Sequence, residues 1–147
     1  MTSTRIQETA AERRPHLIKG GSIMAYDIAI DVNASDIVLT DDGDIMLIDN
    51  AERVAQQIVI SLRFWLGEWF LDTSLGVPYL EYVLVKNPNI NHVRQVIAEA
   101  IMQVTGVSRV DRLDFDYDAP NRALSVIYEV ETDEGLITRK EILGYNK

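Results

Sequence analysis

The chain has 147 residues, a formal net charge of −9 and no cysteine. Its length suits one domain with a substantial core, and the lack of cysteine excludes disulfide bridges, thiolate metal sites and cysteine nucleophiles. The acidic balance argues against nucleic acid or an anionic membrane as the main partner, because neutralising phosphates takes clustered Lys and Arg. No apolar run approaches the ~20 residues of a membrane span, so we expect no membrane insertion.

Residues 1–23 lack apolar periodicity and predict either a flexible arm or translated upstream sequence. They carry a net charge of +2, whereas the remainder carries −11. Strand-like patterning begins after Met24, and Lys19-Gly20-Gly21 can be encoded by a purine-rich ribosome-binding sequence at a workable distance from that codon. Two alternatives follow: a natural start at Met24, or a basic arm that docks on a neighbour. In both, residues 24–147 form a single domain.

Residues 27–48 predict two or three short strands separated by turns. The first apolar residues alternate with other residues, and two further apolar runs follow at 37–39 and 45–48. The acidic segment 41–44 between these runs predicts a hairpin turn. A calcium loop does not fit this segment, because Gly43 stands where a loop of that kind needs a ligand.

The middle of the chain predicts two amphipathic helices. Asn50 is a suitable N-cap for the first, over residues 51–66, and Gly67 is a suitable C-terminal stop. Residues 78–85 are typical of a short helix or turn. The second helix is expected from residue 90 or 91 to 104, with an apolar stripe of Val93, Val96, Ile97, Ala100, Ile101 and Val104.

The C-terminal third predicts a three-stranded antiparallel meander. Strands are expected over residues 107–117, 123–132 and 136–143, with turns between them. In the middle strand, period-two geometry places four side chains on one face: Leu124, Val126, Tyr128 and Val130. The chain therefore predicts an α+β fold, with two main helices packed on a small antiparallel sheet that ends in this meander.

The first of the predicted C-terminal strands carries Asp114, Asp116 and Asp118 on one face. Such a ladder could hold a hard cation, but a solvated strand face is the preferred interpretation. Either Val110 or Leu113 begins the opposite, apolar face. With only two histidines and no glycine-rich phosphate loop, the sequence predicts no metal, cofactor or nucleotide site.

The segment from Gly67 to Tyr79 is the most distinctive part of the chain. It sets several large apolar residues beside Glu68 and Asp72, and so apolar a loop is expected to be buried, in the chain's own core or in a partner. The two carboxylates could form an acid–base pair for a glycosidic bond. The preferred alternative is that they fix the loop or contact a partner, because carboxylates of this kind also occur in structural networks.

The first helix, the following Gly67-Glu68-Trp69 and the turn that closes at Gly76 resemble the baseplate wedge family of contractile-tailed phages. This superfamily includes the phage W protein and the lysozyme-like wedge subunit, and is shared with the sheath-initiating subunit of type VI secretion. Trp69 stands where the family pattern has an arginine, and the proline of that pattern is missing. The form Gly-Glu-Trp-Phe-Leu-Asp, followed by Gly-Val-Pro-Tyr, is similar to the Mu-type branch. The resemblance covers about residues 26–140.

The resemblance implies a structural baseplate protein, present in six copies, that templates the first ring of the sheath. The implied partners are the tail sheath subunit and other wedge subunits, with tube or hub proteins as further candidates. The implied location is the tail baseplate of the virion, assembled in the host cytoplasm. Some members carry a lysozyme label, so the rival is a peptidoglycan-cleaving enzyme that uses Glu68 and Asp72.

A meander that ends near the C-terminus leaves a sheet edge to which a neighbour could add a strand. The aromatic residues after the first helix would suit an anchor in a wedge partner. We therefore expect partner contacts, and no catalysis, at the following residues: Glu68, Trp69, Phe70, Asp72, Tyr79, Tyr82, Ile137, Ile142 and Leu143.

Overall fold

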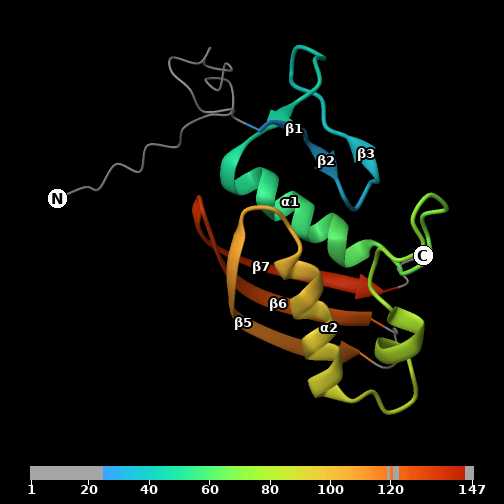
Figure 1. Ribbon diagram of the computed structural model, residues 1–147. Coiled ribbons are helices and arrows are strands. Elements are labelled where there is room, and N and C mark those ends of the chain that lie inside the picture. Colours follow the sequence, from blue (N-terminus) through green and yellow to red (C-terminus); the bar gives the residue numbers. More distant parts are fainter. Residues whose placement is uncertain (1–24, 119, 121–122, 145–147) are drawn as a thin grey trace.

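The computed structural model describes residues 25–118, 120 and 123–144, so the predicted arm or leader at 1–23 lies outside the described part. The elements occur in the order β1 (Asp27–Ile28), β2 (Ile30–Asp31), β3 (Asp36–Ile37), β4 (Leu47–Ile48), α1 (Asn50–Arg63), η2 (Tyr79–Val83), α2 (Ile90–Met102), β5 (Val107–Asp118), β6 (Ala123–Thr132) and β7 (Gly135–Gly144). This arrangement confirms the predicted α+β fold (Figure 1).

The three long strands form an antiparallel sheet in the order β5-β6-β7. In β6 the predicted inner face is confirmed, because Leu124, Val126, Tyr128 and Val130 are all buried. In β5 the pairing register shifts between Val110 and Arg112. Such a bulge adds a residue and reverses the alternation beyond it. Both Val110 and Leu113 therefore pack against the core, although positions three apart in a regular strand would face opposite sides.

Helices α1 and α2 cover one face of this sheet (Figure 1). The fully buried Ile58 and Leu62 of α1 meet Ile97 and Ile101 of α2 in a single core with the inner face of the strands. The predicted apolar stripe of α2 therefore faces the core. The Asn89 side chain caps α2 by accepting from two backbone N–H groups of its first turn, at 3.0 and 3.4 Å.

The boundaries of α1 differ from the prediction at both ends. Asp49 is the N-cap residue, and its side chain makes no capping hydrogen bond. The helix ends at Arg63, three residues earlier than predicted, because Phe64 is extended (ψ 119°) and Trp65 forms a parallel bridge with Val77. A long-range backbone pairing thus ends the helix before the glycine that the sequence favours as its stop.

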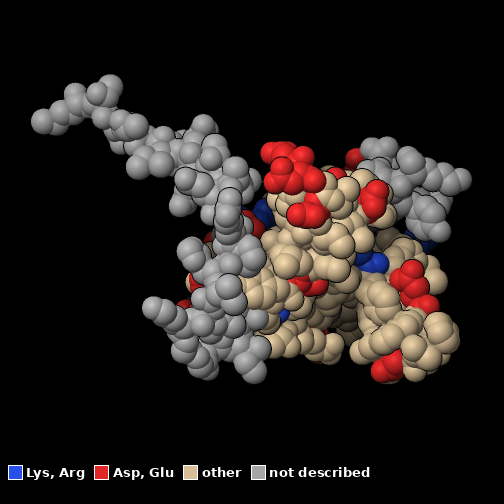
Figure 2. Space-filling view, turned by 90° about the horizontal axis from the view of Figure 1, so that it is seen from above, with Lys and Arg blue, Asp and Glu red and all other residues tan. Residues whose placement is uncertain are grey.

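Strands β1–β4 form a small N-terminal meander on the side of α1 away from the large sheet (Figure 1). Leu39 bridges Ile45 across the 41–44 turn, so the predicted hairpin is present. The side-chain amide of Gln56 in α1 fastens the meander, since it donates to the carbonyl of Ile28 and accepts from the N–H of Ile30, both at 2.8 Å. Viewed from above, acidic atoms gather at the upper edge of a largely uncharged surface (Figure 2).

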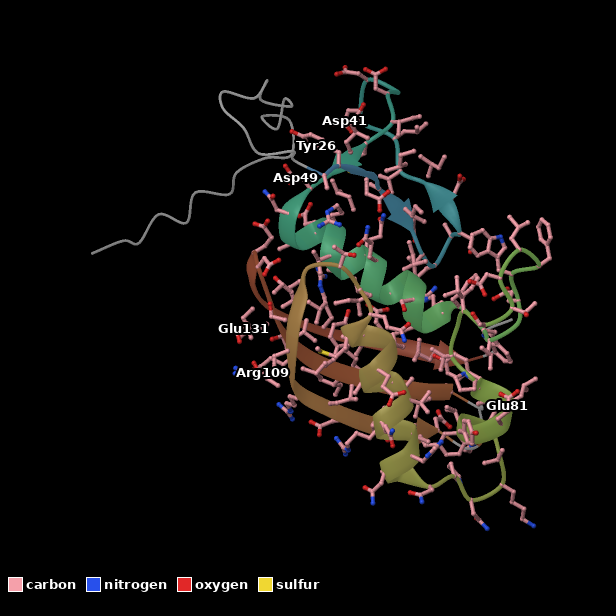
Figure 3. All side chains as sticks on the ribbon, in the orientation of Figure 1. Tyr26, Asp41, Asp49, Glu81, Arg109 and Glu131 are labelled. Carbon is pink, nitrogen blue, oxygen red and sulfur yellow. The ribbon has the colours of Figure 1, made fainter. Side chains whose placement is uncertain are left out.

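The carboxylates of β5 lie in a charged strand face that also carries cations. Asp114 accepts a hydrogen bond from Arg112 (2.5 Å), and Arg109 pairs with Glu131 of β6 at 3.1 Å (Figure 3). These pairs are exposed and contribute little to stability. Within the described ranges, no group of three or more His, Cys, Asp or Glu side chains is placed to hold a metal ion.

Candidate partner-binding loop

Residues 67–76, here called the Trp69 loop, form a closed excursion that starts and ends at one backbone pairing. The N–H of Leu66 donates to the carbonyl of Val77 (3.0 Å), and the N–H of Val77 donates to the carbonyl of Phe64 (2.8 Å). Because Phe64 follows directly on α1, the base of the loop is fixed to a helix that is packed in the core. The loop is therefore a defined projection from a rigid support.

Gly76 is required by the way in which the loop closes. Its φ of +106° is rare for L-residues, and a Cβ there would lie 2.5 Å from both the carbonyl carbon and the oxygen of Trp65. Gly67, at the start of the loop, also has a positive φ (+81°), but a Cβ there would meet nothing within 4 Å. The two glycines of the motif thus have different roles: Gly67 supplies a turn, and Gly76 allows two backbone segments to touch.

Both carboxylates of the loop make local hydrogen bonds that hold its turns. Glu68 accepts from the N–H of Trp65 (3.1 Å), and Asp72 accepts from the N–H (3.0 Å) and the hydroxyl (2.6 Å) of Ser74. The Ser74 hydroxyl and N–H lower the pKa of Asp72 below its usual value, so this exposed carboxyl is ionised at neutral pH and cannot donate a proton. The contacts favour the interpretation in which the carboxylates fix the loop.

The apolar side chains of the loop are largely exposed. Trp69 is 42% exposed, Phe70 83% and Leu71 69%. Of the two alternatives for this apolar loop, burial in the chain's own core does not hold for Phe70 and Leu71, which are more exposed than Trp69. A projecting aromatic and aliphatic tip of this kind is typical of a protein interaction site.

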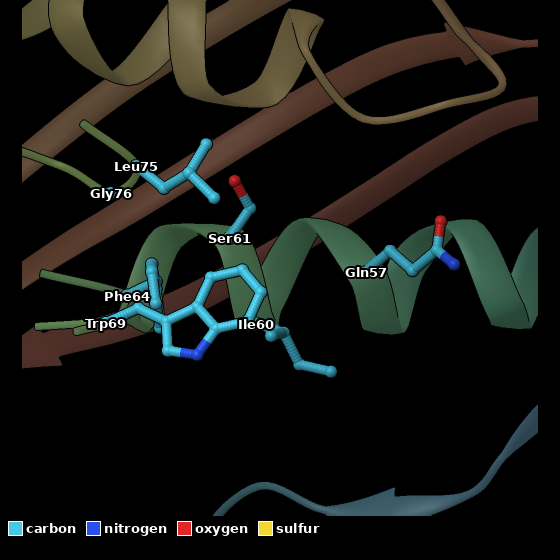
Figure 4. Close-up of a pocket in the computed structure, with 7 residues that line it drawn as sticks. All are labelled: Gln57, Ile60, Ser61, Phe64, Trp69, Leu75 and Gly76. Atoms are coloured by element: carbon cyan, nitrogen blue, oxygen red, sulfur yellow. The ribbon is translucent and has the colours of Figure 1, made fainter. Parts of the chain in front are cut away.

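An apolar cavity of about 480 Å³ lies between the Trp69 loop and the last two turns of α1 (Figure 4). Its lining residues are Gln57, Ile60, Ser61, Phe64, Trp69, Leu75 and Gly76. A second cavity of about 270 Å³ shares Ser61 and Gly76 with it and extends toward Tyr82 and His92. Neither Glu68 nor Asp72 lines either of these two cavities.

The two tyrosines that follow the loop differ in position. Tyr79 is buried in the chain's own core, where its hydroxyl donates to the Leu62 carbonyl and its ring lies 5.3 Å from that of Trp65. Burial raises the pKa of Tyr79, which keeps the phenol protonated as a donor. Its side chain supports the loop from within, and the expected direct partner contact is not available to it. Tyr82 is 43% exposed and packs against His92 with the two rings tilted, their centroids 4.2 Å apart.

The expected partner residues of β7 also divide into two groups. Ile137 and Leu143 are buried against β6, opposite Val130 and Leu124, so only their backbone could meet a partner. Ile142 lies on the other face of the strand and is exposed. Of these three residues of β7, only Ile142 has a side chain that a partner could contact.

Two residues that line the larger cavity, Ile60 and Leu75, were not predicted from the sequence as site residues. Ile60 is a large aliphatic residue that falls outside the buried stripe of α1, and this signal could have identified it. The role of Arg63 was not predicted either: it donates to the carbonyl of Val32 in the N-terminal meander and pairs with Glu141 of β7 at 3.9 Å. No sequence pattern predicts that connection, because it depends on the packing of three separate elements.

Comparison with known families gives one match. The family model for the contractile injection system sheath initiator matches residues 26–135, which include the Trp69 loop, both helices and most of the large sheet. No match was found among curated proteins. No helix in the described part of the chain is long and apolar enough to cross a bilayer. Since the match spans about three quarters of its length, the chain belongs to the contractile injection system sheath initiator family, whose role in sheath initiation is structural.

Proposed function

We propose that this sheath initiator joins the tail baseplate to the tail sheath and templates the first sheath ring by strand sharing. The observation that carries the proposal is β7, a ten-residue strand that pairs along its whole length with β6 and, among the described residues, with no other strand. Its second edge offers a row of backbone donors and acceptors to a strand from a sheath subunit. Such pairing supplies main-chain hydrogen bonds and needs no cofactor.

Charged side chains on β7 favour selective pairing over indiscriminate aggregation. Arg139 and Glu141 stand opposite the buried Tyr128 and Val126, so they lie on the inner face of an edge strand. Inward-pointing charges are one way in which proteins protect their sheet edges. On the outer face, Leu136 and Ile142 remain exposed and could be covered by the side chains of an added strand.

The Trp69 loop is proposed as the contact with another baseplate wedge subunit. Its exposed tip, with Trp69 and Phe70, and the adjacent apolar cavity provide both an anchor and a pocket, the combination that is common at interface hot spots. In this proposal six copies sit on the wedges of a tail baseplate assembled in the host cytoplasm. Tube or hub proteins are secondary candidates for contact.

No catalytic role is proposed for Glu68 and Asp72. The Glu68→Gln variant tests this point, because glutamine retains a carbonyl oxygen that can accept from Trp65 but provides no ionisable group. We expect purified parent and variant to show no measurable hydrolysis of peptidoglycan. Turnover in the parent that disappears in the variant would revive the enzymatic alternative.

The strand-sharing proposal is tested by Ile142→Asp in a host whose own gene has been deleted, with Ile142→Val as the matched control. Ile142 is 53% exposed, so both variants should fold, which a thermal unfolding measurement verifies. By negative-stain electron microscopy, we expect Ile142→Asp to give tubes or baseplates without an ordered sheath and Ile142→Val to give sheathed particles. Normally sheathed particles with Ile142→Asp, or from the deletion host itself, would contradict the proposal.

The wedge contact is tested by Phe70→Ala, with Val85→Ala as a control at another exposed apolar position. Because Phe70 is 83% exposed, its truncation should leave the free energy of unfolding unchanged within about 0.5 kcal/mol. We expect Phe70→Ala protein to be missing from purified baseplates and Val85→Ala protein to be present. Equal incorporation of the two would remove the Trp69 loop from the interface.

A further inference from the structure

The N-terminal meander presents six large aliphatic side chains on one face. Residues paired directly opposite one another share a face of a sheet, as do residues two apart in a strand. The pairs Ile28–Leu47, Ile30–Ile37 and Leu39–Ile45, connected through these two-residue steps, therefore lie on the same side. We call this set the aliphatic face: Ile28, Ile30, Ile37, Leu39, Ile45 and Leu47.

All six residues of the aliphatic face are exposed, by 37 to 57%. The opposite face of the meander, which meets α1, carries the buried Ala29 and the half-buried Val38 and Met46. Hydrogen bonds to Gln56 hold that side in place. The meander thus packs its smaller apolar surface against α1, and its larger apolar surface faces outward. Contiguous apolar patches of this kind mark interaction sites on soluble proteins.

The charged residues of the meander's own segment are of one sign. Residues 25–52 contain seven aspartates and one glutamate, and no Lys, Arg or His. Asp41 lies on the hairpin of the meander (Figure 3), and the space-filling view shows a group of acidic atoms at the upper edge of a mostly uncharged surface (Figure 2). A partner that covers this face must place its own charges against this acidic rim, and only cations are attracted there.

We propose that the aliphatic face binds a segment of a different protein subunit, one that presents aliphatic side chains flanked by Lys or Arg. A second copy of the chain is disfavoured, since two faces in contact would bring two acidic rims together. This site lies on the meander and is distinct from the Trp69 loop and from the edge of β7. The inference depends on the proposed function only in that the assembled particle is where the partner is sought.

The absence of cysteine from the chain allows a direct test with single thiols. Leu39→Cys and Ile45→Cys place a thiol on the aliphatic face, and Lys86→Cys places one at an exposed position in the loop before α2. The rate of maleimide labelling is measured for each variant as free protein and in purified particles. We expect labelling of both face thiols to slow at least about tenfold in particles relative to Lys86→Cys, because a thiol reacts only while its surface is uncovered.

The occupant is then identified with a photoactivatable maleimide on the same two face thiols, followed by mass spectrometry of the crosslinked peptides. A peptide from another subunit, with aliphatic residues and at least two Lys or Arg, supports the proposal. Crosslinks to residues 1–23 of the same chain, to a second copy, or to an acidic segment would overturn it. Unchanged labelling of the face thiols in particles that contain the protein would overturn it as well, while leaving the proposed function intact. If even the parent chain is absent from the particles, both this proposal and the proposed function are contradicted.

The acidic rim is tested with the crosslinked partner segment as a synthetic peptide. The triple change Asp41→Asn, Asp42→Asn and Asp44→Asn leaves the aliphatic face in place and removes three charges from its rim. We expect weaker binding of the peptide at low salt and a smaller dependence on ionic strength than for the parent protein. Equal affinity and equal salt dependence of the two proteins would show that charge does not select the partner.

Discussion

The two glycines of the Trp69 loop allow a matched test of how the loop closes. In Gly67→Ala the new Cβ meets nothing within 4 Å, so only the positive φ is penalised, by about 1–2 kcal/mol. In Gly76→Ala the same backbone penalty applies, and the Cβ also lies 2.5 Å from the Trp65 carbonyl. That contact forces apart the two segments that carry the hydrogen bonds Leu66–Val77 and Val77–Phe64, each worth about 1 kcal/mol.

We therefore expect Gly76→Ala to lower the free energy of unfolding by about 3–4 kcal/mol, roughly twice the effect of Gly67→Ala. The assay is urea denaturation followed by far-ultraviolet circular dichroism, with tryptophan fluorescence in parallel. Both tryptophans, Trp65 and Trp69, belong to the loop or its base, so fluorescence reports on the loop itself. If Gly76→Ala is no less stable than Gly67→Ala, the close backbone approach does not exist and the description of the loop is wrong.

Four further variants test the packing that supports the proposed binding surfaces. Tyr79→Phe removes a buried donor to the Leu62 carbonyl and should lower the free energy of unfolding in urea by about 1–2 kcal/mol. Tyr128→Phe should be neutral or stabilising, because the buried Tyr128 hydroxyl has no hydrogen-bond partner among the described residues. Burial raises the pKa of Glu141, although Arg63 and Arg139 oppose this, so the contribution of Glu141 to stability is greatest in acid and is lost as the pH rises through its folded pKa. Unfolding measured at about pH 4 and pH 7 should therefore show Glu141→Gln gaining stability relative to the parent at the higher pH, and a gain at the lower pH would contradict the direction of the shift. Asn89→Ala removes the side-chain cap of α2 and should lower the free energy of unfolding by about 1 kcal/mol, measured by the helical signal in circular dichroism.

The large sheet and α2 could be predicted from the sequence because their signals are local and agree with one another. Alternation in β6 and the capped apolar stripe of α2 each specify both the element and its buried face. The end of α1 could not be predicted, because the Trp65–Val77 pairing overrides the stop favoured at Gly67. Local propensity is a weak guide wherever a distant backbone segment competes for the same hydrogen bonds.

The candidate binding residues were harder to predict than the fold. An apolar pattern in the sequence indicates which side chains are buried. It does not indicate whether they are buried in the chain's own core or in a partner. Tyr79 and Phe70 illustrate this: both belong to one aromatic motif, yet Tyr79 is 4% and Phe70 83% exposed. The difference arises from the pinned base of the loop, which holds Tyr79 under Trp65 and carries Phe70 away from the core. Only the three-dimensional path of the chain distinguishes the two.

Arg63 links the three surfaces for which partners are proposed. It is the last residue of α1, directly before the base of the Trp69 loop, and its guanidinium donates to the carbonyl of Val32 in the N-terminal meander and to the Asn33 side chain at 3.3 Å. The same group lies 3.9 Å from Glu141 of β7. Since a guanidinium is planar, permanently charged and rich in donors, one side chain can hold three elements in a fixed arrangement. A protein that templates a ring, as we propose for this chain, must fix the relative positions of its partners, and the packing around Arg63 provides a physical basis for doing so.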